Sequence, residues 1–168
     1  RLVLTSRRGP QAPGAAELVD ELAGRGVAAT VVACDVADPR AVAALVHDLE
    51  ISGEAVRSVV HTAGVVDLAP LNELTVAELA AVSAGKVAGA RNLDAVLDRA
   101  ALDTVVYFSS IAAVWGVGDH GAYAAANAPA ATVIDPLPPV ASSSVTAHST
   151  TAPLWYRSVE ESRRSENT

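Results

Sequence analysis

The segment AATVVACDVADPRAVAALVHDLE, residues Ala28–Glu50, contains the pattern that decides the fold. It begins with a short run rich in β-branched residues, which is typical of a buried strand. Asp38 and Pro39 follow, and they predict the start of a helix, because an aspartate caps the first turn and a proline there loses no hydrogen bond. The segment therefore predicts a strand followed directly by a helix.

The same alternation extends in both directions along the chain. Three more strand-like runs are RLVLTS (residues 1–6), RSVVHTAG (57–64) and LDTVVYFSS (102–110). Helical patterns lie at residues 15–26, 75–97 and 120–128. Continuous apolar strands that alternate with helices favour a parallel sheet with both faces covered. Right-handed crossovers make this a doubly wound α/β sheet, which binds ligands beyond the carboxyl ends of its strands.

Composition limits the possible functions. The 168 residues are 51% hydrophobic, which is enough to form the core of one domain. The net charge is −7 and no Lys/Arg cluster stands out, which argues against nucleic-acid binding. Cys34 is the single cysteine, so no internal disulfide is expected. Neither a signal peptide nor an apolar run of roughly 20 residues is visible, so we expect a cytoplasmic protein that does not span a membrane.

The composition changes after Asn127. The remaining residues include five prolines and a Ser/Thr-rich stretch before a charged end. A proline inside a helix removes a hydrogen bond and breaks the helix. We therefore expect a partial domain at residues 1–130 and an irregular or disordered tail at 131–168, with at most a weak helix near 153–164.

The stretch FSSIAAVWGVGDHGAYAAAN, residues 108–127, has the residue types of a proton-transfer site. Tyr123 and Asn127 are four residues apart, so a helix places both on one face. A phenol, with a pKa near 10, is a poor acid at neutral pH unless a cation stabilises the phenolate, and Lys86 could supply that charge. Ser110 could hydrogen-bond a substrate oxygen nearby. Such groups can protonate a carbonyl while a reduced nicotinamide delivers hydride.

Each of these residues also has an ordinary structural interpretation. A serine pair after a strand is often a helix or turn cap, and a tyrosine in an alanine-rich helix often only packs. An asparagine four residues later can be coincidence, and a lone lysine is usually solvated. Their joint position at predicted strand ends favours the functional interpretation, and no metal site is expected.

Taken together, the motifs of this sequence resemble those of a known family. The resemblance is to the ketoreductase domain of modular type I polyketide synthases, and it covers residues 1–128. The motifs that match in order and spacing are LVLTSRRGP, CDVAD, VVHTAGV, the helix with Lys86, and FSSIAAVWG with YAAANA. These domains are a branch of the short-chain dehydrogenase/reductase superfamily, with a Rossmann-like fold. The resemblance implies NADPH-dependent reduction of a β-ketoacyl thioester on an acyl carrier protein, with the other domains of a synthase module as partners.

The resemblance also implies roles for individual residues. In the family, the lysine comes from the upstream helix and an asparagine follows the tyrosine by four positions, as in this chain. Tyr123 is then the proton donor, and Ser110 orients the carbonyl. Lys86 and Asn127 support the phenol and the nicotinamide ribose.

The cofactor NADPH is favoured over NADH by two arginines. Arg7 and Arg8 follow the first strand, where the family binds the adenosine 2′-phosphate, and a guanidinium binds phosphate through a two-pronged fork. We rank Arg7 ahead of Arg8; the alternative is a solvated loop charge. The other implied cofactor contacts are Asp35 at the adenine amine, Val36 packed beside it, and Ala63 and Gly64 where the cofactor nears the backbone.

Family markers predict the stereochemistry of the product. A-type ketoreductases carry a tryptophan eight residues before the tyrosine, where this chain has Trp115. B-type members carry Leu-Asp-Asp after the HTAGV-like strand end, whereas this chain reads Val66-Asp67-Leu68. Both features imply an A-type domain and an L-configured hydroxyl, and His120 resembles the A2 subtype. The alternative is that Trp115 is structural.

Two departures from the family are expected to matter. The family's first strand and Gly-rich loop, which bind the cofactor pyrophosphate, would precede Arg1, and its last strand and lid have no counterpart after Asn127. The sheet would then lack its central strand and expose an apolar seam, which leaves the activity of the isolated chain open. The alternatives are a non-catalytic remnant or structural half-domain, and a free-standing short-chain ketone reductase. Asn127 argues against the reductase, because such enzymes usually have a lysine there.

Overall fold

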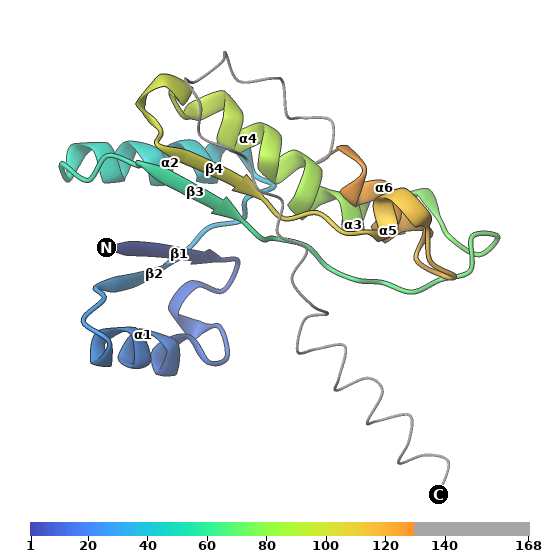
Figure 1. Ribbon diagram of the computed structural model, residues 1–168, viewed down its shortest axis with the longest axis horizontal. Coiled ribbons are helices and arrows are strands. Elements are labelled where there is room, and N and C mark those ends of the chain that lie inside the picture. The colour runs from blue at the N-terminus through green and yellow to red at the C-terminus, as the bar shows by residue number, and fades with distance from the viewer. Residues whose placement is uncertain (130–168) are drawn as a thin grey trace, which may run out of the picture. The chain divides into compact units, whose positions relative to one another are not determined.

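Four short parallel strands form the sheet structure. The computed structural model, shown in Figure 1, describes residues 1–129. Strand β1 (Leu2–Ser6) pairs with β2 (Ala29–Ala33), and β3 (Ser58–His61) pairs with β4 (Thr104–Tyr107). All four strands coincide with predicted apolar runs, and both pairs are parallel, as predicted.

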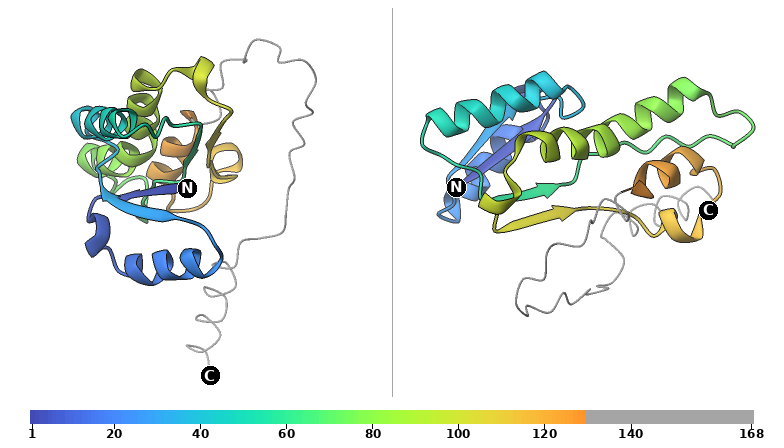
Figure 2. Two further views of the ribbon diagram at one scale, coloured as in Figure 1. Left: turned by 90° about the vertical axis from the view of Figure 1, so that its left-hand side faces the viewer. Right: turned by 90° about the horizontal axis from the view of Figure 1, so that it is seen from above.

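Helices connect the strands in the predicted alternating order. The α-helices are α1 (Ala15–Gly24), α2 (Pro39–Ile51), α3 (Val76–Ser83), α4 (Gly89–Val96), α5 (Ala112–Trp115) and α6 (Gly121–Asn127). Two short 3₁₀ turns are η1 (Gly9–Gln11) and η3 (Arg99–Ala101). A π-helical segment, η2 (Ala84–Ala88), joins α3 to α4. Helix α1 lies on one side of the β1–β2 pair and α2 on the other, which is the doubly wound arrangement (Figures 1 and 2).

The strands form two separate pairs rather than one continuous sheet. Within residues 1–129, β1 bonds only to β2, and β3 bonds only to β4. Each pair exposes apolar side chains, since Val60 of β3 is 60% exposed and Leu2 of β1 is 43% exposed.

The helix starts follow local sequence signals. Asp38 accepts a hydrogen bond from the backbone N–H of Arg40 at 2.8 Å, and Pro39 is the first residue of α2, as predicted. Thr75 and Glu78 form a reciprocal capping box at the start of α3. Both motifs satisfy backbone N–H groups that the first helical turn leaves without partners.

The predicted long helix at 75–97 is interrupted. It runs as α3, η2 and α4, with the π-helical turn centred on Lys86. A π-helical turn inserts one residue into the helical repeat and is often found at functional sites. Beside it, a small core of Val82, Ala122 and Ala126 joins α3 to α6.

Two further observations concern the chain as a whole. Among the helices of the described residues, none combines the length and the apolar character needed to cross a bilayer. The predicted irregular tail at 131–168, with its possible helix near 153–164, lies outside the described residues.

Candidate functional site

Lys86 lies at the carboxyl end of β4. Its side chain is 9% exposed, and its ammonium donates a hydrogen bond to the backbone oxygen of Phe108 at 3.0 Å. Burial lowers the pKa of Lys86, because the low-dielectric surroundings disfavour the charged form. Phe108 directly precedes Ser109 and Ser110, so the cation lies next to the predicted serine pair.

Gly64 lies under the side chain of Lys86. A Cβ atom at this position would lie 2.8 Å from Cε and 3.3 Å from Nζ of Lys86. Real Cβ atoms essentially never approach another heavy atom this closely. The side chain of Lys86 therefore lies where a side chain at position 64 would otherwise be. Ala63, the second residue expected there, is half-buried opposite Gly85.

His61, the last residue of β3, also contacts the Lys86 segment. Its Nε2 lies 3.2 Å from the backbone oxygen of Lys86, and the side chain is buried. Its ring packs edge-on against Tyr107 with 5.9 Å between centroids. Desolvation lowers the pKa of His61, so the ring is neutral at pH 7. Sequence analysis did not select His61, although it stands within the quoted HTAG motif.

Helix α6 carries Tyr123 and Asn127 on one face. Asn127 is fully buried, and its Nδ2 donates to the backbone oxygen of Tyr123 at 2.7 Å. Its Oδ1 is buried and has no hydrogen-bond partner within the described residues. Tyr123 is half-buried and packs against the small core that includes Val82 and Ala126.

The two serines after β4 have different roles. Ser109 donates a hydrogen bond from its Oγ to the backbone oxygen of Asn127 at 3.0 Å, which ties the end of β4 to α6. Ser110 accepts from the backbone N–H of Ala112 at 3.2 Å, so its hydroxyl stabilises the local turn just before α5. Sequence analysis chose Ser110 and missed Ser109. Lys86 and Asn127 thus bond to adjacent residues, Phe108 and Ser109.

The predicted cofactor residues at the ends of β1 and β2 form a separate group. Arg7 and Arg8 are exposed, and within residues 1–129 neither guanidinium group forms a hydrogen bond or ion pair. Asp35 accepts from the backbone N–H of Ala37 at 3.0 Å, so it serves as a turn former. Val36 is half-buried, and its backbone oxygen accepts from Asn92 of α4 at 2.9 Å.

Comparison with known families identifies the chain. The family model described as the KR domain matches residues 1–137, which is more than half of the 168 residues. This chain belongs to the KR domain family. These are the ketoreductase domains of modular polyketide synthases, oxidoreductases of the short-chain dehydrogenase type that use a nicotinamide cofactor, so the predicted family and enzyme class are confirmed.

The relatives of this KR domain are parts of large synthases. Over 127 residues it is 61% identical to polyketide synthase GfsA of Streptomyces halstedii, with 76% of this chain and 2% of that protein covered. It is 52% identical to erythronolide synthase EryA3 of Saccharopolyspora erythraea over 127 residues, covering 76% and 4%. The chain therefore spans only a small part of the curated relatives that it matches.

Solved ketoreductase structures have the same fold. A ketoreductase from the first module of phoslactomycin biosynthesis in Streptomyces sp. HK803 gives a TM-score of 0.73 at 45% identity, covering 76% of this chain and 29% of that chain. A structure titled as an A-type ketoreductase from a modular polyketide synthase gives 0.70 at 50% identity, covering 75% and 26%. The predicted Rossmann-like fold class is thus confirmed.

The residues expected to control stereochemistry lie around α5 and α6 of the KR domain. Trp115 ends α5 and is 81% exposed, and Leu68 is 58% exposed. The backbone N–H of Ala69 donates to the oxygen of Asp119 at 3.0 Å, which brings the loop of Leu68 beside His120. His120 packs its ring edge-on against Tyr123 with 6.2 Å between centroids. Leu68 and His120 are therefore neighbours in the chain fold.

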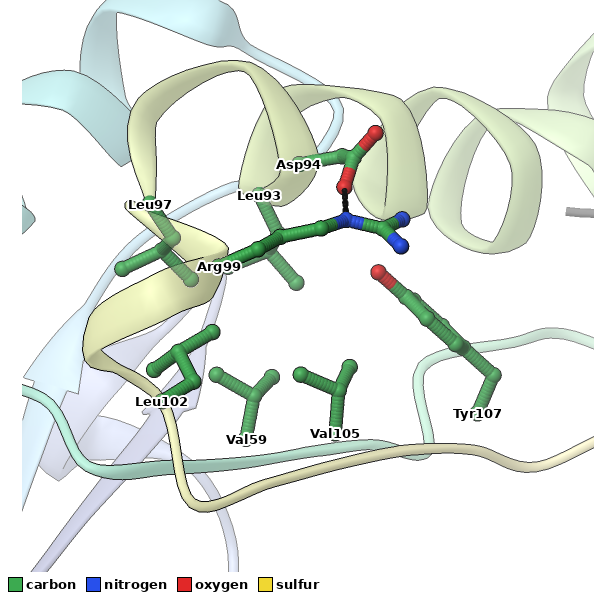
Figure 3. A pocket seen from close by; sticks show the side chains of 8 residues that line it. All are labelled: Val59, Leu93, Asp94, Leu97, Arg99, Leu102, Val105 and Tyr107. Carbon is green, nitrogen blue, oxygen red and sulfur yellow. Dashed lines mark hydrogen bonds and ion pairs between the residues drawn. The ribbon is translucent and has the colours of Figure 1, made fainter. Parts of the chain in front are cut away.

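A cavity elsewhere in the KR domain contains none of the predicted site residues. Figure 3 shows this apolar hollow between α4 and the β3–β4 pair, lined by Val59, Leu93, Asp94, Leu97, Arg99, Leu102, Val105 and Tyr107. Arg99 and Asp94 pair across its rim. Within residues 1–129, no group of three or more His, Cys, Asp or Glu side chains could hold a metal ion.

Proposed function

We propose that this KR domain reduces a β-ketoacyl thioester, carried on an acyl carrier protein, to a β-hydroxyacyl thioester with NADPH. The observation that carries the proposal is that Lys86 and Asn127 bond to adjacent residues at the end of β4. A buried cation and the helix that carries Tyr123 are thus each bonded to a residue beside or within the serine pair, which supports the proposal. Family membership supplies the reaction class, and the acyl carrier protein belongs to the proposal as the partner that polyketide synthase modules require.

The residues present fit a phosphorylated dinucleotide. The unpartnered, buried Oδ1 of Asn127 is an acceptor suited to a ribose hydroxyl. The exposed guanidinium groups of Arg7 and Arg8 suit a 2′-phosphate, and in this role they distinguish NADPH from NADH. NADPH would supply the hydride for reduction of the keto carbon.

The chain's own residues would handle the proton. Tyr123 would donate its hydroxyl proton to the carbonyl oxygen of the substrate, and Ser110 would hydrogen-bond the same oxygen. The positive charge of Lys86 favours the phenolate that remains on Tyr123. Both the proton and the charge that it leaves behind are thus handled by residues around the end of β4.

The stereochemical part of the proposal rests on Trp115. Its exposed indole would block one direction of approach for the acyl chain and so give an L-configured hydroxyl. A structure titled as an A-type ketoreductase is 50% identical to this chain, which supports an A-type assignment.

Titration of the 168-residue chain with NADPH, followed by cofactor fluorescence, tests the proposal. We expect saturable binding that weakens about tenfold in Arg7→Ala, since a charge-assisted hydrogen bond contributes roughly 1.5 kcal/mol or more. Binding of NADH should change little. Arg25→Ala is the matched control, because Arg25 pairs with Glu21 at the end of α1.

Absence of saturable NADPH binding would instead support a second candidate. The division of the strands into two pairs that expose the apolar side chains of Leu2 and Val60 favours a non-catalytic, structural half-domain. Such a chain would bind neither cofactor and would show no turnover of a β-ketoacyl thioester.

A further inference from the structure

We propose that His61 and Gly64, at the carboxyl end of β3, are positioning residues that hold the side chain of Lys86 in place. The inference rests on the proposed function of Lys86 as the active-site cation. It concerns two residues that touch the lysine from opposite ends, one at its backbone and one along its alkyl chain.

His61 holds the backbone of the π-helical segment. Its Nε2 lies 3.2 Å from the oxygen of Lys86, and a carbonyl oxygen can only accept a hydrogen bond. The ring must therefore carry its hydrogen on Nε2. The neighbouring Gly89 keeps the ring in this orientation, because a Cβ there would lie 2.9 Å from Cε1 of His61.

Gly64 determines the path of the lysine side chain. Its backbone conformation is open to any residue, since its φ lies outside the positive range. The three atoms nearest to an added Cβ all belong to Lys86, whose Cε and Nζ would lie 2.8 and 3.3 Å away. A methyl group at this position would displace the ammonium from the oxygen of Phe108.

Three contacts thus hold Lys86 from its backbone to its ammonium. His61 bonds to the backbone, Gly64 makes room for the alkyl chain, and the oxygen of Phe108 accepts from the ammonium. A long lysine side chain loses much rotamer freedom in such a site. Its confinement aims the charge toward the serines after β4.

The surroundings of Lys86 can be measured by NMR without interference from other lysines, because Lys86 is the single lysine of the chain. Lysine labelled with ¹³C at Cε, incorporated into the full 168-residue chain, gives one methylene signal in an NMR spectrum without further assignment. In the parent, we expect two distinct Hε resonances, shifted from those of free lysine. In His61→Phe and Gly64→Ala, the two resonances should merge and move to the free-lysine position.

Matched variants separate positioning from general damage. His61→Gln keeps an amide donor at a similar reach and should retain the parent signal. Gly85→Ala is the glycine control, since its added Cβ would meet Gly64 and Ala63 only at 3.8 Å or more. His47→Phe, on the exposed side of α2, should also retain the signal.

Parent-like Lys86 signals in both His61→Phe and Gly64→Ala would overturn the proposal. If His61→Phe loses its far-UV circular dichroism, Gly64→Ala decides alone, since the lysine can move aside without disturbing the backbone. Where the parent reduces a β-ketoacyl thioester, kcat should fall about 100-fold in His61→Phe and recover in His61→Gln, as expected for a misplaced catalytic group. A parent that is inactive but shows the fixed Lys86 signal would contradict the proposed function and leave the positioning inference standing.

Discussion

The most informative single residue is Lys86. Burying an ammonium removes it from water, and within residues 1–129 Lys86 regains one hydrogen bond, to the oxygen of Phe108. No carboxylate of the described part of the chain pairs with it, and burial lowers its pKa. Burial is unfavourable for the charge of Lys86, yet three contacts hold the residue there. The proposed site explains this position, because its chemistry needs a cation.

Tyr123 is the residue on which the proposed proton transfer depends. Replacement by phenylalanine removes the hydroxyl and keeps the ring that packs against Val82 and Ala126. We expect reduction of a β-ketoacyl thioester to slow by roughly 10²-fold to 10⁴-fold, the usual contribution of a general acid. Turnover is measured by loss of NADPH absorbance, and thermal unfolding should stay near that of the parent. A variant with parent-like turnover would remove Tyr123 from the mechanism.

His61 should make stability depend on pH. Its pKa in the folded chain lies below the ordinary value of 6.5, so the unfolded chain binds the proton more readily. The free energy of unfolding should therefore fall as the pH drops through about 6.5, and recover above it. Urea unfolding at about pH 7.5 and pH 5.5 should show a larger loss for the parent than for His61→Gln. Equal losses in the two proteins would contradict a buried, neutral histidine.

At the residue scale, sequence reasoning selected residues whose chemistry suits the proposed reaction and missed residues that contact them in the fold. Tyr123, Asn127 and Lys86 stood out by type and spacing. His61 and Ser109 act through backbone oxygens of residues 25 and 18 positions away, and no local pattern records such partners. The roles of the predicted site residues stay predictions until the variants are measured.

At the scale of elements, the sequence predicted where helices start but not the interruption inside the helix expected at 75–97. The caps at Asp38 and Thr75 are made within three residues of sequence, so local patterns predict them. The π-helical turn η2 was not predicted. This turn is contacted by His61, which lies 25 residues before Lys86 in the sequence, and by α6. Only the folded chain brings these segments together.

The cap of α2 gives a prediction for an element. Asp38→Ala removes the acceptor for the backbone N–H of Arg40 and should lower the free energy of unfolding by about 1 kcal/mol. Asp48→Ala removes the same charge from the other half of α2. The side chain of Asp48 forms no hydrogen bond within the described residues, so the free energy of unfolding should change little. Urea unfolding of both variants checks this. Equal losses would show that net charge, rather than capping, is responsible.

At the scale of the whole KR domain, α4 links the two strand pairs. Asn92 of α4 donates to the oxygen of Val36 after β2, and Gly89 lies against both Val36 and His61 of β3. The two pairs share no ladder hydrogen bonds, so this junction is one of the contacts that join them. Figure 2 shows α2 and α4 side by side above the strands.

Gly89→Ala should weaken this junction. An added Cβ would lie 2.9 Å from both Cγ2 of Val36 and Cε1 of His61, so the residues must separate. We expect a loss of roughly 1–3 kcal/mol in the free energy of unfolding, the usual cost of overpacking. Gly24→Ala, in α1 with open space around it, should instead stabilise by roughly 0.5–1 kcal/mol. If Gly89→Ala matched Gly24→Ala in thermal and urea unfolding, α4 would not be a tight junction.

The sequence by itself determined the alternation of strands and helices, the two caps and the set of chemically suited residues. These depend on apolar periodicity and on bonds between near neighbours, which are local. Only the tertiary structure decided that Lys86 fills the space beside Gly64, that Ser109 ties β4 to α6, and that the strands form two pairs. Those outcomes depend on contacts between residues far apart in the chain, whose distances are set by packing rather than by any sequence pattern.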